Sequence, residues 1–168
     1  MNETIGLIGI GVMGSNIALN FSDNNIPVHV FNRSEDKINL LIDKDSKGNI
    51  TGTTDIQNFV NNLPKPRKIL MLIPSGKPTL DMAKKLIEHL EPNDILIDGG
   101  NAYYLDSNKL GEICSRKEIE FVGMGVSGGE EGARKGPALM IGSSNPINNE
   151  LKNSLSSIIT FFVWFPMY

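Results

Sequence analysis

The 168-residue sequence predicts an α/β domain, in which helices cover both faces of a doubly wound parallel sheet. Short apolar runs that suit buried strands alternate with segments whose apolar residues recur at helical spacing. A glycine-rich turn directly follows the first of these strands, and no linker, repeat or low-complexity stretch interrupts the chain. We therefore expect one domain over residues 1–160, followed by an atypical apolar end at residues 161–168.

The predicted elements follow one another in a regular order. Runs of apolar residues predict strands at residues 4–8, 27–32, 67–74, 94–100, 119–126 and 138–142. Helical spacing predicts helices at residues 12–21, 34–43, 55–63, 79–90, 105–117 and 145–159. Ser34 is expected to cap the second helix, and Thr54 or Asp55 the third. Residues 44–54 form a polar connection. Because strands and helices alternate at this interval, the strands are expected to pair in parallel.

The composition excludes several classes of protein. A net charge of -3, without a stripe of Lys and Arg along any predicted helix, argues against a nucleic-acid partner. The single cysteine, Cys114, cannot form an internal disulfide, and no spacing typical of metal ligands occurs. No basic leader is present, and no apolar run reaches the roughly 18 residues that a membrane span needs. We expect a cytoplasmic protein with no metal site.

The segment GIGVMG places Gly9, Gly11 and Gly14 in the spacing G-x-G-x-x-G, between a predicted strand and a predicted helix. In that context the first glycine permits a tight turn, the second lets a pyrophosphate approach the backbone, and the third lets the helix pack on the strand. The free N–H groups of the helix N-terminus favour phosphate. The pattern therefore indicates dinucleotide binding. The alternative is that the glycines serve only the turn.

The end of the second predicted strand distinguishes between the two nicotinamide dinucleotides. NAD-binding domains usually carry Asp or Glu there, which accepts hydrogen bonds from the ribose 2′-hydroxyl. This chain has the neutral Asn32, then Arg33, which can pair with a phosphate and stack on adenine, and Ser34, which adds a hydroxyl. The sequence therefore favours NADP. The alternative is an exposed arginine at a strand end.

Two further loops follow the fourth and fifth predicted strands. After two glycines, Asn101 is placed to present its amide to the nicotinamide side and to a substrate hydroxyl or carboxylate. Ser127, Gly128 and Gly129 offer a hydroxyl and adjacent N–H groups, which suit an anionic oxygen. These loops indicate an anionic substrate. The alternative for the second loop is a glycine-rich turn before a helix that begins with two glutamates.

The segments GLIGIGVMGSN, VFNRS, LIDGGN and GVSGGEEGARKGPALM together resemble the NADP-dependent 6-phosphogluconate dehydrogenases, over about the first 145 residues. The segments DGGN and SGGEEGAR-x-GP separate that family from β-hydroxyacid dehydrogenases with the same glycine motif. The resemblance implies a Rossmann NADP-binding domain. It also implies oxidation of the C3 hydroxyl of 6-phosphogluconate by hydride transfer to NADP, and then loss of CO2 to give ribulose 5-phosphate in the pentose phosphate pathway.

The resemblance also implies individual roles. Cofactor-binding residues would be Gly9, Ile10, Gly11, Val12, Met13 and Gly14 at the pyrophosphate, Asn32, Arg33 and Ser34 at the 2′-phosphate, and Ile73, Pro74 and Ser75 along adenine and ribose. Asn101 would contact both cofactor and substrate, and Ser127, Gly128 and Gly129 would hold the sugar acid. The family usually has a lysine where Pro74 stands.

One part of the family pattern has no counterpart in this sequence. The family's catalytic lysine and glutamate lie in a later segment, KMVHNGIEYGDM, within a C-terminal helical domain that also builds the homodimer. We therefore predict no catalytic residue in this chain, and NADP binding without activity when the chain is alone. Two alternatives stay open: another β-hydroxyacid dehydrogenase, and a non-catalytic NADP-binding module.

Overall fold

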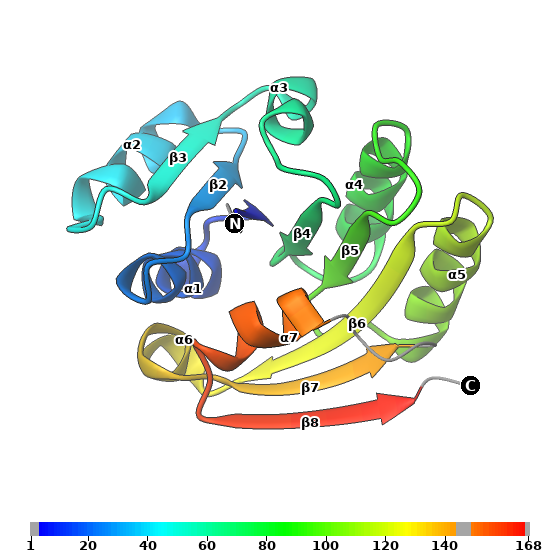
Figure 1. The fold of residues 1–168 in the computed structure, drawn as a ribbon. Helices are drawn as coiled ribbons and strands as arrows, with labels where there is room; N and C mark the ends of the chain where they lie inside the picture. The colour runs from blue at the N-terminus through cyan, green and yellow to red at the C-terminus, as the bar shows by residue number, and fades with distance from the viewer. Residues whose placement is uncertain (1–3, 144–148, 167–168) are drawn as a thin grey trace.

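The computed structural model describes residues 4–143 and 149–166. Within them, eight strands form one sheet in the order β3-β2-β1-β4-β5-β6-β7-β8, with seven flanking helices (Figure 1). The strands are β1 (Ile5–Ile8), β2 (Val28–Phe31), β3 (Ile50–Thr53), β4 (Lys68–Met71), β5 (Ile95–Asp98), β6 (Glu120–Ser127), β7 (Ala138–Ser143) and β8 (Phe161–Pro166). The helices are α1 (Val12–Asp23), α2 (Glu35–Lys44), α3 (Ile56–Asn61), α4 (Lys77–Ile87), α5 (Tyr104–Ser115), α6 (Gly129–Lys135) and α7 (Asn149–Ser156).

The predicted fold class is confirmed, because helices lie on both faces of a mostly parallel sheet. Two buried clusters fill the space on either side. Helices α1, α2, α6 and α7 contribute to one cluster, and α3, α4 and α5 to the other (Figure 1). Representative side chains of the first cluster are Ile17, Phe21, Ile38, Ala133 and Leu151. Those of the second are Phe59, Leu86 and Leu110.

The expectation that all strands pair in parallel is wrong at one position. Strands β6 and β7 are antiparallel, with Ser127 opposite Ala138, whereas the other neighbours in the sheet pair in parallel. A parallel pair needs a crossover of about a dozen residues or more, which carries the chain back to the other edge of the sheet. The connection from β6 to β7 contains only the short helix α6, so β7 starts at the edge where β6 ends.

Two strands lie where the sequence predicted none. Strand β3 falls in the polar connection at residues 44–54, and of its four residues only Ile50 is buried. It pairs with β2 at the edge of the sheet, where polar residues are tolerated and the apolar pattern is therefore weak. Strand β8 falls in the segment that the sequence sets apart as an apolar end. Its backbone pairs in parallel with β7, so the sheet continues through Pro166.

The helix boundaries agree with the sequence in most places. Asp55 caps α3, with its carboxylate accepting from the N–H of Asn58 at 2.6 Å. Ser34 occupies the capping position of α2, but its hydroxyl makes no capping hydrogen bond. Helix α4 begins two residues earlier than predicted, at Lys77. Part of the predicted helix at residues 145–159 lies outside the described residues, and the described part is α7.

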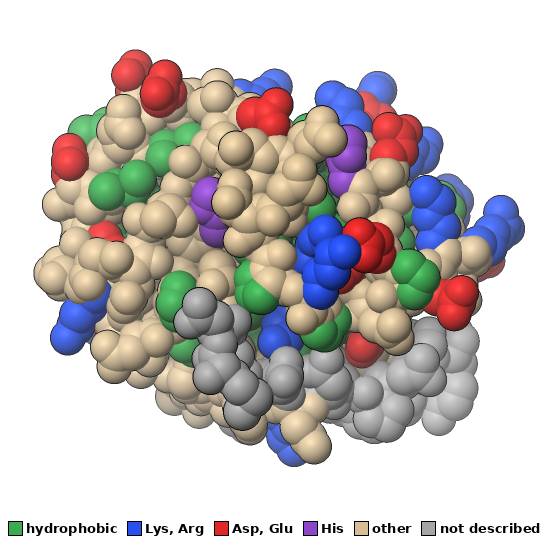
Figure 2. Space-filling view, turned by 45° about the horizontal axis from the view of Figure 1, so that its top comes forward, with side chains coloured by type: hydrophobic (Ala, Val, Ile, Leu, Met, Phe, Trp, Pro, Cys, Tyr) green, Lys and Arg blue, Asp and Glu red, His purple; other side chains and the backbone are tan. Residues whose placement is uncertain are grey.

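The surface and interior add general observations. On the face that Figure 2 shows, acidic and basic side chains are interspersed, and the described apolar side chains are scattered. In the part of the chain that the structure describes, no helix is long and apolar enough to cross a membrane, and no group of His, Cys, Asp and Glu is arranged to hold a metal ion. Cys114 is buried, and burial raises the pKa of its thiol to about 11.

Candidate functional site

The predicted site residues lie in the loops at the carboxyl ends of strands β1, β2, β4, β5 and β6. The chain order of the strands reverses between β1 and β4, because β2 and β3 lie on one side of β1, and β4 to β6 on the other. Ligands of open α/β sheets bind in the crevice at such a reversal, outside the carboxyl ends of the strands. The loops after β1, β2 and β4 border this crevice.

Two of the three glycines after β1 are required by the packing of the protein itself. Gly9 has a φ of +91°, and a Cβ there would lie 2.5 Å from the carbonyl oxygen of Leu72 and 2.5 Å from Cγ2 of Ile73. A Cβ on Gly14 would overlap the carbonyl oxygen of Gly9. The turn therefore brings β1, α1 and the loop after β4 closer together than any larger residue permits.

Gly11 is different, because neither backbone strain nor packing explains it. Its φ is -71°, and a Cβ there would meet no atom within 4 Å. The open space lies at the N-terminus of α1, where no side chain caps the helix. The nearby hydroxyl of Ser15 donates to the carbonyl of Ile10 at 3.0 Å and so leaves the helix end free. Uncapped N–H groups beside open space fit a pyrophosphate.

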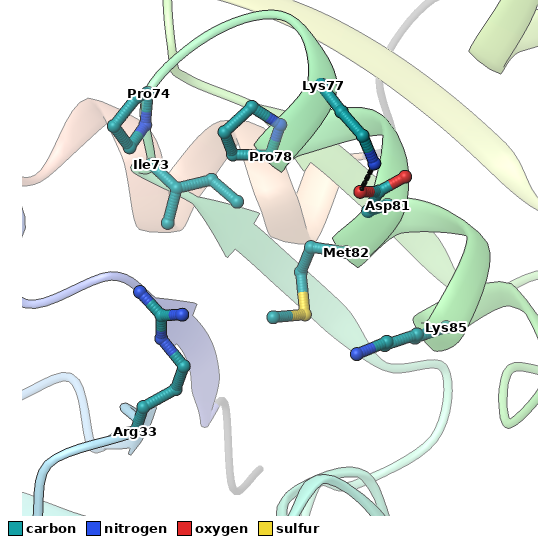
Figure 3. A pocket seen from close by; sticks show the side chains of 8 residues that line it. All are labelled: Arg33, Ile73, Pro74, Lys77, Pro78, Asp81, Met82 and Lys85. Carbon is teal, nitrogen blue, oxygen red and sulfur yellow. Dashed lines mark hydrogen bonds and ion pairs between the residues drawn. The ribbon is translucent and has the colours of Figure 1, made fainter.

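A pocket of about 430 Å³ lies between the loop after β2 and helix α4 (Figure 3), and Ile73, which lines it, also packs against Gly9 of the turn. Its charged lining residues are Arg33, Lys77, Lys85 and Asp81, which gives three cations, one carboxylate and a net charge of +2. Lys77 donates to the Asp81 carboxylate in an exposed ion pair. This hydrogen bond is the main reason that the pKa of Asp81 is lowered, so the carboxylate is ionised at neutral pH. The pocket therefore favours an anionic ligand.

The other wall of the pocket is apolar. Ile73, Pro74, Pro78 and Met82 line it, and Figure 3 shows Met82 projecting between Arg33 and α4. An apolar wall with an arginine at its edge suits a flat heteroaromatic ring such as adenine. The structure thus brings together the predicted residues Arg33, Ile73 and Pro74. The predicted residue Ser75 follows Pro74 and is exposed, but it does not line this pocket.

The neighbours of Arg33 hold the loop after β2 in place. The backbone N–H of Asn32 donates to the carbonyl of Thr53 at 3.4 Å, and its side-chain amide donates to the carbonyl of Ser34 at 3.2 Å. Both Asn32 and Ser34 are half-buried, whereas Arg33 is exposed. Of the three residues predicted at this loop, only Arg33 lines the pocket.

Sequence reasoning missed the contribution of α4 to the pocket. The sequence predicted this helix only from the helical spacing of its apolar residues, of which Ala83 and Leu86 are buried. A signal was nevertheless present: Lys77, Asp81 and Lys85 are spaced at i, i+4 and i+8, which places them on one side of the helix. In the structure all three residues line the pocket, so this side of α4 faces it.

Asn101 connects the two loops predicted to bind substrate. Its Oδ1 accepts from the N–H of Val126 at 3.2 Å, and its Nδ2 donates to the carbonyl of Val126 at 3.4 Å. Its φ is +55°, a conformation that Asn adopts more readily than most residues. Since Ser127 follows Val126, Asn101 fixes the end of β6 relative to β5. The amide nitrogen carries a second N–H, which leaves one donor for a ligand.

The loop from Ser127 to Gly129 is exposed and shaped by positive φ angles. Gly128 has a φ of +123° and Gly129 a φ of +61°. Both values lie in the region that side chains rarely adopt, so the backbone itself requires glycine here. The first turn of α6 then carries Glu130 and Glu131. The loop thus offers neutral donors next to two carboxylates.

Asp98, at the end of β5, is a buried carboxylate that the sequence analysis did not single out. It is 2% exposed, and its Oδ1 accepts from the N–H of Gly100 at 2.9 Å. Its Oδ2 has no hydrogen-bond partner among the described residues, and burial raises the pKa of the carboxyl. Together with Asn101 and Ser107 it lines a hollow of about 310 Å³.

The glycine turn, the uncapped helix and the cationic pocket at the strand reversal define a dinucleotide-binding domain of the Rossmann type. Comparison with known families gives a more specific result. Residues 4–164 match the family described as the NAD binding domain of 6-phosphogluconate dehydrogenase, and the chain belongs to this family. The resemblance read from the sequence motifs is thereby confirmed.

Individual relatives agree with this assignment. A decarboxylating 6-phosphogluconate dehydrogenase of Chlamydia trachomatis is 51% identical over 144 residues, which make up 85% of this chain and 30% of that protein. The NADP(+)-dependent, decarboxylating 6-phosphogluconate dehydrogenase of Bacillus subtilis is 42% identical over 156 residues, which are 93% of this chain and 33% of that protein.

A solved structure is similar as well. The Plasmodium falciparum 6-phosphogluconate dehydrogenase, described in apo form, with NADP+ and with 6-phosphogluconate, matches with a TM-score of 0.86 at 36% identity. The match covers 93% of this chain and 34% of that one. The chain therefore spans about a third of the length of the relatives it matches.

Proposed function

We propose that this chain is the cofactor-binding part of an NADP-dependent, decarboxylating 6-phosphogluconate dehydrogenase. The whole enzyme oxidises 6-phosphogluconate with NADP and releases CO2, which leaves ribulose 5-phosphate. The single observation that carries the proposal is the combination of open space at the uncapped N-terminus of α1 with an adjoining pocket of net charge +2. The first suits a pyrophosphate, and the second suits the adenosine end of a phosphorylated dinucleotide.

The choice of NADP over NAD rests on the loop after β2. A carboxylate at its start would repel a 2′-phosphate, but the residue there is Asn32, whose amide is engaged in holding the loop. Arg33 lines the pocket and can form charge-assisted hydrogen bonds with the phosphate. The names of two relatives support this choice, since one is NADP(+)-dependent and the other was solved with NADP+.

Each loop has a role in this proposal. The bound nicotinamide would accept the hydride from the substrate. The residues from Gly9 to Gly14 hold the pyrophosphate, and Ile73 and Pro74 border the adenosine. Ser75, which follows them outside the pocket lining, would reach the ribose side from the same loop. Asn101 holds the end of β6 in place, and its remaining N–H would serve the nicotinamide and the substrate. Ser127, Gly128 and Gly129 bind the sugar acid with neutral donors. No residue of this chain is proposed as the catalytic acid or base.

The proposal for the 2′-phosphate is tested by Arg33→Ala, with Arg116→Ala as the matched control. Arg116 is an exposed arginine beyond the end of α5 and lies outside the pocket. Affinities for NADP and NAD are measured by calorimetry on each variant. We expect Arg33→Ala to weaken NADP about 10-fold to 100-fold, the usual value of hydrogen bonds to a charged group, and to weaken NAD by a clearly smaller factor, because NAD loses only the contact of Arg33 with adenine. Equal losses for both cofactors would contradict the proposed role.

The remaining proposals concern the whole protein and rest on the family. We expect a cytoplasmic homodimer that needs neither a membrane nor a nucleic acid. Sedimentation of the full-length parent tests the dimer, because a monomer at micromolar concentration would contradict it.

A further inference from the structure

The cationic pocket contains one positive charge that the proposed function leaves without a role. Arg33 comes from the loop after β2, and Lys85 comes from the third turn of α4 on the opposite wall. Figure 3 shows the Lys85 ammonium extending from α4 into the pocket, with Met82 between it and Arg33. The two cations line the same pocket from different elements of the fold.

The ion pairs of the pocket distinguish the two lysines that line it. Lys77 is held by the carboxylate of Asp81, so its charge is compensated within the helix. Neither Lys85 nor Arg33 has an ion-pair partner among the described residues. Asp81 also interacts with Lys85 electrostatically, but its hydrogen bond goes to Lys77. The uncompensated charge of the pocket thus resides on Arg33 and Lys85.

We infer that Lys85 is a second cation for the 2′-phosphate of NADP and determines, together with Arg33, the preference for NADP over NAD. A phosphate monoester carries a charge of about -1.5 to -2 at neutral pH, which matches two cations better than one. Arg33 provides directional hydrogen bonds, and Lys85 provides a mobile point charge from the other wall. This inference rests on the proposed function, because it concerns the same cofactor.

The test compares Lys85→Gln with Lys84→Gln. The two lysines are adjacent and exposed on α4, and both substitutions remove one positive charge, but only Lys85 lines the pocket. A third variant, Lys85→Arg, keeps the charge. The affinities for NADP and NAD are measured by calorimetry on each chain, together with those for adenosine 2′,5′-bisphosphate and adenosine 5′-monophosphate, which isolate the adenosine end of the cofactor.

We expect Lys85→Gln to weaken NADP and the bisphosphate about threefold to tenfold, as for a partly exposed charge contact. NAD and the monophosphate should change by less than about twofold. Lys84→Gln should leave all four affinities close to those of the wild-type chain. Lys85→Arg should retain most of the preference for NADP over NAD.

Each contrary outcome has its own meaning. If Lys85→Gln leaves the ratio of NADP to NAD affinity unchanged, or if Lys84→Gln lowers it equally, the inference is overturned and the proposed function stands. If the wild-type chain has no preference for NADP, the proposed cofactor is wrong and the inference fails with it.

Discussion

The two glycine loops at the crevice look alike in sequence but differ physically. The loop from Gly9 to Gly14 leads into a twelve-residue helix without a side-chain cap, next to a pocket of net charge +2. The loop from Ser127 to Gly129 leads into a seven-residue helix whose first turn carries two glutamates. The buried carboxylate of Asp98 ends the neighbouring strand. Glycines open the backbone in both regions, but only the first region supplies positive charge for a phosphate.

This difference predicts that the two regions bind different ligands with different strength. The first region combines the uncapped N-terminus of α1 with a pocket of net charge +2. The second region offers the hydroxyl of Ser127, backbone N–H groups and one N–H of Asn101, all of which are neutral donors. Neutral hydrogen bonds contribute about half as much as charge-assisted ones. We therefore expect this chain to bind a sugar acid more weakly than it binds NADP.

The largest expected effect is on the free energy of unfolding, and it differs between two glycines of the first loop. Gly14→Ala should lower the free energy of unfolding by about 3 kcal/mol, because the added Cβ overlaps the carbonyl oxygen of Gly9 and α1 must shift. Gly11→Ala is the matched control, since its Cβ enters open space at an ordinary φ. Denaturant unfolding measures both variants. Equal stability of the two would show that the turn is not closely packed.

The next effect concerns the contact that organises the second region. Asn101→Ala removes two hydrogen bonds to Val126 and places Ala at a φ of +55°, so we expect a loss of about 2 kcal/mol. Asn101→Gly removes the same bonds without the strain and should cost about half as much. Hydrogen exchange followed by mass spectrometry should show faster exchange around Val126 but not around Gly9. Unchanged exchange at Val126 would contradict the positioning role of Asn101.

Asp98 makes the second region sensitive to pH in a way that can be tested by substitution. Burial raises the pKa of this carboxyl, so the folded state favours its protonated form and ionisation costs stability as the pH rises above about 4. Asp98→Asn retains an acceptor for the N–H of Gly100 and should raise the free energy of unfolding at pH 7 by about 1 kcal/mol. Thermal unfolding at pH 7 measures the change. A large destabilisation would indicate that Oδ2 has a partner in solution.

The smallest effect lies in strand β2, outside both loops, and its dependence on pH has the opposite sign. His29 is buried against Phe59 and shares a hydrogen bond with Thr51 at 2.8 Å. Burial lowers the pKa of His29, so the folded state favours neutral imidazole. Its contribution to stability is complete above about pH 6.5 and is lost as the pH falls below that value. His29→Gln should therefore flatten the decline of Tm between pH 7 and pH 5. If the decline of Tm with falling pH is unchanged in this variant, titration of other groups causes it.

The sequence predicted the parts of the fold that depend on strong local patterns. Strands β1, β2, β4, β5 and β6 are mostly buried and therefore require mostly apolar residues. This apolar pattern allowed each of them to be predicted. The edge strand β3 was missed because only Ile50 needs an apolar side chain. The direction of β7 was wrong because direction depends on the length of the connection rather than on the residues of the strand itself. Strand β8 was missed because its pairing with β7 depends on contacts between distant segments and not on a pattern within its own residues.

The candidate site was predictable to a similar extent. Motif spacing located the glycine turn, Arg33 and Asn101, because these residues follow strands whose positions are clear. It did not distinguish Gly11, whose space is open, from Gly14, whose Cβ would overlap the backbone. It also did not predict that Lys85 lines the pocket, because that depends on which loop lies opposite the helix. Such a relation exists only in the folded chain.

The most direct test of the account is a calorimetric titration of the wild-type chain with NADP, NAD and 6-phosphogluconate at the same pH and ionic strength. We expect NADP to bind at least about tenfold more tightly than NAD, and 6-phosphogluconate to bind more weakly than NADP. Equal affinity for NADP and NAD, or tighter binding of 6-phosphogluconate than of NADP, would contradict it.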